Sequence, residues 1–232
     1  MKVLIIIPAY NEQECIKGVV DNLIHNYPQY DYVVVNDGSK DDTLKILEEN
    51  HYSYINLPGN LGIGGAMQTG FLYGYENGYD ITVQVDGDGQ HNPAYIQDLI
   101  QPIIDGEADM VIGSRYLTGE GFQSTGLRRL GIKIISTTIQ ILCGKKIFDV
   151  TSGFRASNRK MTRFFSENYA EDYPEPEAII ATIKQGGKIK EVPVLMNERQ
   201  GGVSSISGFK AVNYMVKVEL ALLINALRKG GN

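Results

Sequence analysis

The chain has 232 residues, of which 43% are hydrophobic and 21% charged, and this composition excludes an intrinsically disordered protein. Its net charge of −5 disfavours a general nucleic-acid binder, because such proteins usually carry an excess of basic residues. Cys15 and Cys143 are its only cysteines, too few for a disulfide framework, so we expect a reducing, cytoplasmic environment.

The first strongly apolar segment, Val3 to Ile7, is shorter than a signal-peptide core of roughly 7–15 residues and is followed by Pro8. Its unbroken aliphatic and β-branched character predicts a strand that is buried on both faces. No stretch reaches the roughly 18 uninterrupted apolar residues that a membrane-spanning helix needs. We therefore expect membrane contact to be peripheral, at the inner face of the cell membrane, or to run through a partner.

Predicted strands and helices alternate through the first 90 or so residues. The predicted strands are Val3–Ile7, Tyr32–Val35, Ser53–Leu57 and a segment that begins at Ile81. The predicted helices are Asn11–Asn26, one led by Thr43 with Asp41 or Asp42 as its cap, and one opened by the glycine-rich segment that follows Pro58. This alternation predicts an α/β fold with a mostly parallel central sheet, whose ligands lie beyond the carboxyl ends of the strands.

The second half of the chain continues with more widely spaced elements. We predict helices at Ile96–Ile104, Leu127–Leu142, Ala178–Lys184 and Gly208–Arg228, strands at Asp109–Gly113 and Ile189–Val194, and a turn-rich segment at Asp149–Arg155. The predicted organisation is one domain over residues 1–207 followed by a C-terminal amphiphilic helix within residues 208–232.

Two of these helices each allow more than one interpretation. Leu127–Leu142 carries basic but no acidic residues, so it is either a core helix with a solvated basic edge or an interfacial helix whose cations meet anionic lipid headgroups. Gly208–Arg228 is too charged to span a bilayer and too apolar to stand alone. The membrane surface, a small membrane protein or a second copy of the chain would each cover it.

The segment from Ile81 to Gln90 predicts a metal site. Asp86 and Asp88 follow a strand at alternate positions, so their side chains share one face of an extended segment, and Gln90 continues the series. Carboxylate and amide oxygens suit Mg²⁺ or Mn²⁺, which keep open positions for substrate phosphates. The alternative is a simple polar turn, which Asp-Gly repeats also form.

Glycines at positions 59, 62, 64 and 65 resemble a phosphate-binding loop only weakly, because no strand here ends in Gly-x-Gly-x-x-Gly. Close packing of a helix on the sheet explains them as well as direct phosphate contact does.

Six motifs in order extend over nearly the whole chain: PAYNE (8–12), VNDGSKDDT (35–43), GNLGIGGA (59–66), DGDGQH (86–91), GSRY (113–116) and TSGFR (151–155). Together they resemble the inverting family 2 glycosyltransferases of GT-A fold, and more closely the branch that contains dolichyl-phosphate mannose synthase and bacterial polyprenyl-phosphate sugar synthases. The resemblance implies that residues 1–207 form a catalytic GT-A domain. Many relatives carry a transmembrane extension, whereas here we expect only the amphiphilic helix before Asn232.

The resemblance also assigns roles to residues. It places the nucleotide of a nucleotide-diphosphate sugar at Pro8, Tyr10, Glu12, Asp37 and Gly62, with Asp37 accepting a hydrogen bond from the base. It places Asp86 near ribose and metal, and it makes Asp88 and Gln90 hold Mg²⁺ or Mn²⁺ on the diphosphate. Contacts to the donor diphosphate and to an acceptor phosphate fall to four arginines: Arg115, Arg128, Arg129 and Arg199.

The acceptor remains open between two chemistries. Polyprenyl phosphate needs no general base, because a phosphate monoester with a second pKa near ~6 is mostly ionised at neutral pH. A hydroxyl of a growing cell-surface glycan would need one, and Asp172 in the acidic run of residues 171–177 is the candidate, although a solvated loop before a helix also explains that run. A nucleotide-sugar-binding protein without turnover is the third interpretation, and the intact Asp86, Asp88 and Gln90 disfavour it.

Overall fold

Seven strands form a single sheet in the computed structural model, which describes residues 1–117, 126–197 and 217–220, and the backbone alone for 126–128. The strands are β1 Val3–Ala9, β2 Asp31–Asn36, β3 Tyr54–Asn56, β4 Ile81–Gln84, β5 Met110–Ser114, β6 Arg155–Asn158 and β7 Ile189–Pro193. The helices are α1 Ile16–Asn26, α2 Thr43–Glu49, α3 Gly62–Glu76, α4 Ile96–Ile104, α5 Gly126–Cys143, α6 Arg159–Asn168 and α7 Pro174–Lys184, with a short 3₁₀ turn at Pro93–Tyr95.

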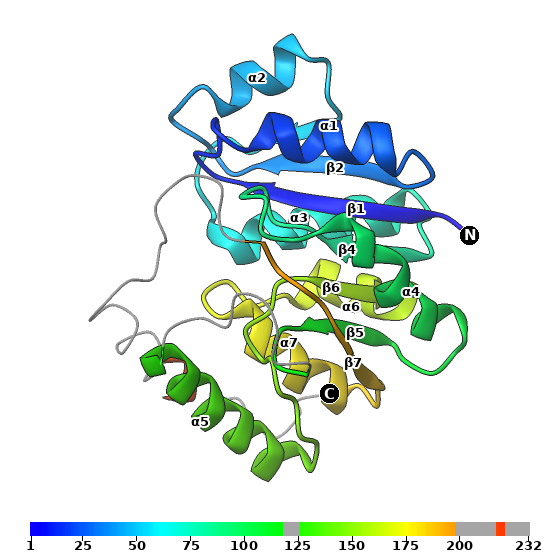
Figure 1. Cartoon of the computed structure of the whole chain (residues 1–232), viewed down its shortest axis with the longest axis vertical. Coiled ribbons are helices and arrows are strands. Elements are labelled where there is room, and N and C mark those ends of the chain that lie inside the picture. Colours follow the sequence, from blue (N-terminus) through cyan, green and yellow to red (C-terminus); the bar gives the residue numbers. More distant parts are fainter. Residues whose placement is uncertain (118–125, 198–216, 221–232) are drawn as a thin grey trace.

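The sheet order is β3-β2-β1-β4-β6-β5-β7, and every neighbouring pair is parallel except the two that involve β6. Because β6 runs antiparallel to both β4 and β5, those two strands run in the same direction as each other. The carboxyl ends of β1, β2, β4 and β5 therefore meet at one edge of the sheet (Figure 1). The predicted α/β fold with a mostly parallel sheet is confirmed.

The core has two layers, one on each face of the sheet, and β1 contributes to both by its two-residue period. Leu4 and Ile6 pack with apolar residues of α3, α5, α6 and α7. Val3, Ile5 and Ile7 pack with residues of α1, α2 and α4 on the other face. All five residues are at most 6% exposed, which explains why the sequence of this strand is an unbroken run of apolar residues.

Helix α3 lies unusually close to the sheet because glycines face it. A Cβ atom on Gly70 would come within 2.2 Å of Ile6 Cγ2, and one on Gly74 within 2.8 Å of Thr82 Cγ2. At the start of the helix, a Cβ on Gly64 would lie 2.2 Å from the carbonyl oxygen of Ala170. Close packing therefore accounts for Gly64, one of the glycines singled out in the sequence.

Most predicted elements are present, with shifts at their ends. Helix α1 begins at Ile16 rather than Asn11, since residues 11–15 form a loop. Asp41, rather than Asp42, supplies the side-chain oxygen at the start of α2, where it accepts from the Thr43 amide at 3.0 Å. The sequence patterns missed β6 and α6 entirely.

The long basic segment forms helix α5, with an inner and an outer face. Ile135 and Ile139 are fully buried, whereas Leu130, Ile134 and Ile141 are 57%, 51% and 77% exposed. Of the predicted C-terminal helix, only residues 217–220 are described; they are helical and contact α5, where Thr138 Oγ1 donates to Glu219 Oε1. Among the described residues, no helix combines the length and apolar character that crossing a bilayer requires.

The close approach of α3 gives a stability prediction. Gly70→Ala should lower the free energy of unfolding by about 1–3 kcal/mol, because the added methyl group overpacks against Ile6. Gly18→Ala is the matched control: Gly18 lies in α1, and nothing lies within 4 Å of the place that a methyl group would take there, so alanine should stabilise by roughly 0.5–1 kcal/mol. Urea denaturation measures both, and equal effects of the two changes would contradict the packing argument.

Candidate active site

The polar residues that follow β1, β2, β4 and β5 gather at the carboxyl edge of the sheet. The register pairs Ala9 with Asn36 and Ile6 with Gln84, which brings the segments that begin at Tyr10, Asp37 and Val85 side by side. In a parallel sheet this edge is where ligands bind. The structure thus brings together the predicted residues of the first half of the chain.

The loops after β1 and β2 are joined by hydrogen bonds from side chains to backbone. Ser39 Oγ accepts from the Asn11 amide at 2.9 Å, and Asn11 Oδ1 accepts in return from the Lys40 amide at 2.8 Å. Gln13 Oε1 accepts from the Asp42 amide at 2.9 Å. Asn11 adopts a φ of 55°, a left-handed conformation that asparagine tolerates better than most residues. The two loops therefore act as one rigid wall.

Within this wall, the predicted nucleotide residues differ in accessibility. Pro8 is buried at the end of β1, whereas the Tyr10 side chain is 41% exposed and open to a ligand. The Glu12 amide donates to Thr43 Oγ1 at 2.9 Å, and Thr43 is itself fully buried, which fixes the backbone at Glu12.

Asp37 ties the end of β2 to the start of α3. Asp37 is 3% exposed, and its Oδ1 accepts a hydrogen bond from the backbone N–H of Leu61 at 2.7 Å. Burial raises the pKa of Asp37, and the backbone amides of Leu61 and Gly62 oppose that shift by stabilising the carboxylate. Gly62 has a φ of +79°, which explains the glycine. The structure therefore shows a second task for Asp37 besides the predicted contact to the base.

The aspartate loop after β4 folds back on itself. The Asp86 side chain is 34% exposed, whereas Asp88 is only 6% exposed. Asp88 Oδ1 accepts a hydrogen bond from the backbone N–H of Gln90 at 3.0 Å. The backbone N–H of Asn197, just beyond β7, donates a hydrogen bond to the backbone carbonyl of Gln90 at 2.9 Å. The segment that follows β7 thereby holds the loop in place.

The donor set fits a hard divalent cation that binds together with phosphates. Among the described residues there is no group of three or more His, Cys, Asp or Glu side chains able to hold a metal by itself. Asp86, Asp88 and Gln90 offer two carboxylates and an amide, and Mg²⁺ commonly takes one or two carboxylates plus substrate phosphates. Substrate oxygens would have to complete the coordination.

Arg115 does not stand alone at this edge. Its Nε donates to Asp149 Oδ2 at 2.7 Å and its Nη2 to Asp149 Oδ1 at 2.7 Å, while its amide also donates to Oδ2 at 3.1 Å. Burial lowers the pKa of Arg115, but the hydrogen bonds and charge of Asp149 outweigh it and the pKa is raised. The pair fastens the turn after β5 to the loop before β6, so any phosphate contact by Arg115 would use N–H groups outside this pair.

The sequence reasoning missed a second buried arginine. Arg155 donates to three carbonyl oxygens: those of Ser152 and Glu175 at 2.6 Å and that of Val150 at 3.1 Å. Burial lowers its pKa. It joins the loop before β6 to the first turn of α7, and its position at the end of the TSGFR motif was the only signal in the sequence.

The remaining predicted residues are either exposed or outside the described part of the chain. Asp172 is exposed in the loop before α7, and Arg129 is exposed on α5. Arg199 and the side chain of Arg128 lie outside the described residues. The predicted contact of the four arginines with phosphate therefore stays a prediction.

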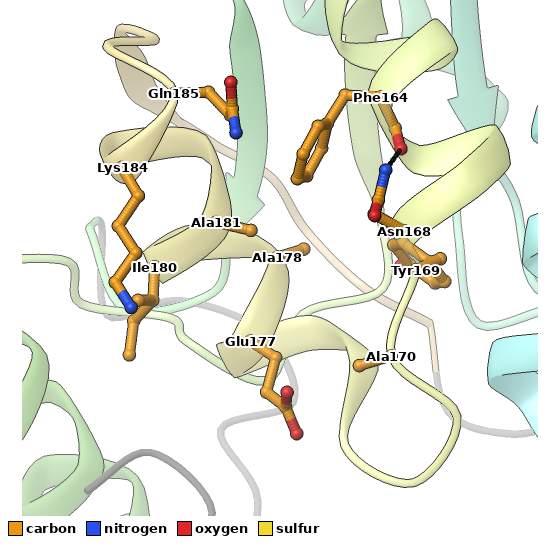
Figure 2. A pocket seen from close by; sticks show the side chains of 10 residues that line it. All are labelled: Phe164, Asn168, Tyr169, Ala170, Glu177, Ala178, Ile180, Ala181, Lys184 and Gln185. Atoms are coloured by element: carbon orange, nitrogen blue, oxygen red, sulfur yellow. Dashed lines mark hydrogen bonds between the residues drawn. The ribbon is translucent and has the colours of Figure 1, made fainter. Parts of the chain in front are cut away.

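A groove of about 450 Å³ lies between α6 and α7 (Figure 2). Phe164, Tyr169 and Ala181 supply apolar surface, and Lys184 and Gln185 lie at the end of α7. Burial raises the pKa of Tyr169, whose ring also packs against Phe71 and Phe165 in the core. The described lining contains none of the residues predicted to bind nucleotide, metal or phosphate, although Glu177 belongs to the acidic run of residues 171–177.

Comparison with known proteins defines the class. Residues 4–165 match the family described as Glycosyl transferase family 2, and the chain belongs to that family. Solved structures of glucosyl-3-phosphoglycerate synthase from Mycobacterium tuberculosis share the GT-A fold: one in complex with phosphoglyceric acid has a TM-score of 0.75 and 20% identity, covering 100% of this chain and 81% of that one.

More similar sequences narrow the class further. Polyprenol monophosphomannose synthase of Mycolicibacterium smegmatis is 33% identical, over 94% of this chain and 85% of its own length. UDP-N-acetylglucosamine–dolichyl-phosphate N-acetylglucosaminyltransferase of Methanococcus voltae is 37% identical, over 83% and 84%. Undecaprenyl-phosphate mannosyltransferase of Micrococcus luteus is 32% identical, over 90% and 88%. The predicted resemblance is confirmed.

The Arg115–Asp149 pair gives a prediction about stability. Asp149→Asn should lower the free energy of unfolding by about 3–5 kcal/mol, because it leaves a buried guanidinium without its counter-charge. Glu107→Gln is the matched control, since Glu107 and Lys190 form an exposed pair that should contribute less than about 1 kcal/mol. Denaturant titrations in which both variants lose the same small amount would show that the buried pair is dispensable.

Proposed function

We propose that the protein transfers a hexose or N-acetylhexosamine from a nucleotide-diphosphate sugar to a polyprenyl phosphate, with inversion at the anomeric carbon, for cell-surface glycan synthesis. Similarity to three relatives whose names specify a polyprenol, dolichyl-phosphate or undecaprenyl-phosphate reaction carries this proposal, since each match extends over at least 83% of the chain. The residues at the carboxyl edge of the sheet support the proposal, because they offer a wall for a nucleotide next to carboxylates suited to a metal.

The donor would lie along the carboxyl edge of the sheet. The base would contact Tyr10 and the wall formed by residues 10–13 and 38–43, with Pro8, Glu12, Asp37 and Gly62 shaping that wall. Asp86, Asp88 and Gln90 would hold Mg²⁺ or Mn²⁺; one structure of the M. tuberculosis synthase is in complex with Mn²⁺ and uridine diphosphate. When bound, the metal would neutralise charge that develops on the departing diphosphate.

The acceptor fits the described chemistry because an ionised phosphate attacks without losing a proton. Arginine forks match phosphate oxygens, and we propose Arg128, Arg129 and Arg199 as acceptor contacts. Arg115 would hold the loop at residues 149–153 beside the aspartate loop. Asp172 would be needed as a general base only if the acceptor were a glycan hydroxyl.

A product assay tests the proposal directly. Purified protein is incubated with a panel of nucleotide sugars, Mg²⁺ or Mn²⁺, and either short-chain polyprenyl phosphate or an oligosaccharide. We expect a charged, acid-labile glycolipid. Extension of the oligosaccharide alone would contradict the proposed acceptor and move Asp172 into the mechanism.

The metal assignment predicts the effect of one substitution. Asp88→Asn keeps the shape of the side chain but removes its charge, so transfer should fall about 10²–10³-fold while the fold is retained. Thermal unfolding and transfer rate are measured on the same preparation. Near-normal transfer at saturating metal would remove Asp88 from the metal site.

We further propose that the outer face of α5 rests on the membrane surface. Leu130, Ile134 and Ile141 form an exposed apolar stripe, and the basic Arg129 and Lys133 flank it. No acidic residue occurs between Leu127 and Lys146, which suits an anionic lipid surface. Each cation contributes about 1 kcal/mol near such a surface and is screened by salt, so the attachment would be reversible.

This proposal predicts selective loss of lipid binding. Leu130→Ser combined with Ile134→Ser should reduce both binding to anionic liposomes and transfer to polyprenyl phosphate, and high salt should release the wild-type protein. Ile24→Ser is the control, because Ile24 is a 39% exposed residue of α1, on the opposite face of the sheet. Sedimentation with liposomes measures binding. An unchanged bound fraction in the double variant would contradict the proposed contact of α5 with the membrane surface.

A further inference from the structure

The carboxylate of Asp86 is enclosed by Gln84 and His91, which lie close to it in the sequence, and by Gly153 from a distant segment. Gln84 Nε2 donates to its Oδ1 at 2.9 Å, and His91 Nε2 lies 3.6 Å from its Oδ2. Gly153 completes the enclosure, since a Cβ there would lie 3.2 Å from Oδ2 and 2.8 Å from Gln84 Nε2. Each carboxylate oxygen thus faces a nitrogen of the protein, and the side chain retains an exposed fraction of 34% for other contacts.

Both ring nitrogens of His91 face Asp86. Its Nδ1 accepts a hydrogen bond from the Asp86 amide at 3.0 Å. A neutral imidazole has one acceptor and one donor nitrogen, so this bond assigns the proton to Nε2, the nitrogen that faces the Asp86 carboxylate. The same ring therefore fixes the backbone of Asp86 by a hydrogen bond and places an N–H group 3.6 Å from its carboxylate.

The His91 ring has little freedom to turn. Its side chain is 3% exposed, and it stacks on Phe154 with a centroid distance of 4.8 Å and an interplanar angle of 11°. Phe154 is fully buried, and its carbonyl accepts from the Gly113 amide at 2.8 Å. The position of the imidazole is therefore set by β5 and the start of β6.

Gln84 is a polar residue in the buried strand β4, where its side chain is out of contact with water. The residue is only 4% exposed, and burying an amide costs free energy unless it is hydrogen-bonded. Its bond to Asp86 Oδ1 supplies that partner. An apolar residue would satisfy the strand, so the amide is explained by what it does for Asp86.

We infer that Gln84 and His91 are positioning residues that set the orientation of the Asp86 carboxylate for the metal–diphosphate complex, an inference that rests on the proposed function. In this role both residues would act through Asp86 and would not themselves contact substrate or metal. Residues that orient a metal ligand in this way typically change metal affinity about 10–100-fold when they are replaced.

Two substitutions of His91 separate positioning from a purely structural role. In His91→Asn, the amide oxygen can take the place of Nδ1 and accept from the Asp86 amide, but nothing replaces Nε2. His91→Phe keeps the stacking on Phe154 and removes both nitrogens, which leaves a buried amide unpaired and should lower stability. Gln84→Met removes the other donor at similar volume. His25→Gln, on the exposed face of α1, is the control.

The measurement is the dissociation constant of Mn²⁺, obtained from the electron paramagnetic resonance signal of the free ion, for Mn²⁺ alone and with uridine or guanosine diphosphate. We expect the dissociation constant to rise at least tenfold for His91→Asn and for Gln84→Met, and not to change for His25→Gln. The melting temperature should change little for Gln84→Met, which keeps the volume, and should fall for His91→Asn, which loses the stacking on Phe154. The Mn²⁺ concentration at half-maximal transfer should rise in parallel, with kcat largely recovered at saturating Mn²⁺.

The outcomes distinguish this inference from the function on which it rests. If His91→Asn and Gln84→Met bind Mn²⁺ like the wild type while Asp88→Asn does not, the metal site stands and the positioning role is overturned. If the wild type itself binds no Mn²⁺ with either diphosphate, both the metal site and the positioning role fail.

Discussion

The parallel register of β1, β2 and β4 is the constraint on which the rest of the site depends. It fixes Tyr10, Asp37 and Asp86 at one edge although they are far apart in the sequence. Side chains of β1 and β2 belong to both core layers and those of β4 (Ile81, Val83) to one, so the edge cannot shift without disrupting the core. Binding groups on the loops are thereby placed by the most stable part of the fold.

A second level of order comes from polar side chains that bind backbone rather than ligand. Asn11 and Ser39 join the first two loops, Arg155 joins the loop before β6 to α7, and Arg115 with Asp149 fixes the turn after β5. Many polar residues of the sequence motifs are thus used to shape the site. Tyr10 and Asp86 are among the smaller number whose side chains remain accessible.

The sequence predicts the elements whose patterns are local, and misses what depends on distant partners. The apolar run of β1 and the periodicity of α4 locate those elements closely. Strand β6, Arg155–Asn158, has three polar residues among four and becomes a strand only by pairing between β4 and β5. Likewise, the motifs predict a site role for Arg115, but Asp149 is 34 positions away and nothing local reveals that the two are paired.

A crystal structure with a nucleoside diphosphate and Mn²⁺ bound is the most direct test of the central claim, that the carboxyl edge of β1, β2 and β4 is the donor site. We predict that the base lies beside Tyr10 against residues 38–43, and that Asp86, Asp88 and Gln90 hold Mn²⁺ together with the diphosphate while the Asp86 carboxylate keeps its contact with Gln84. A diphosphate bound instead in the groove between α6 and α7, with the aspartate loop free of metal, would contradict the account.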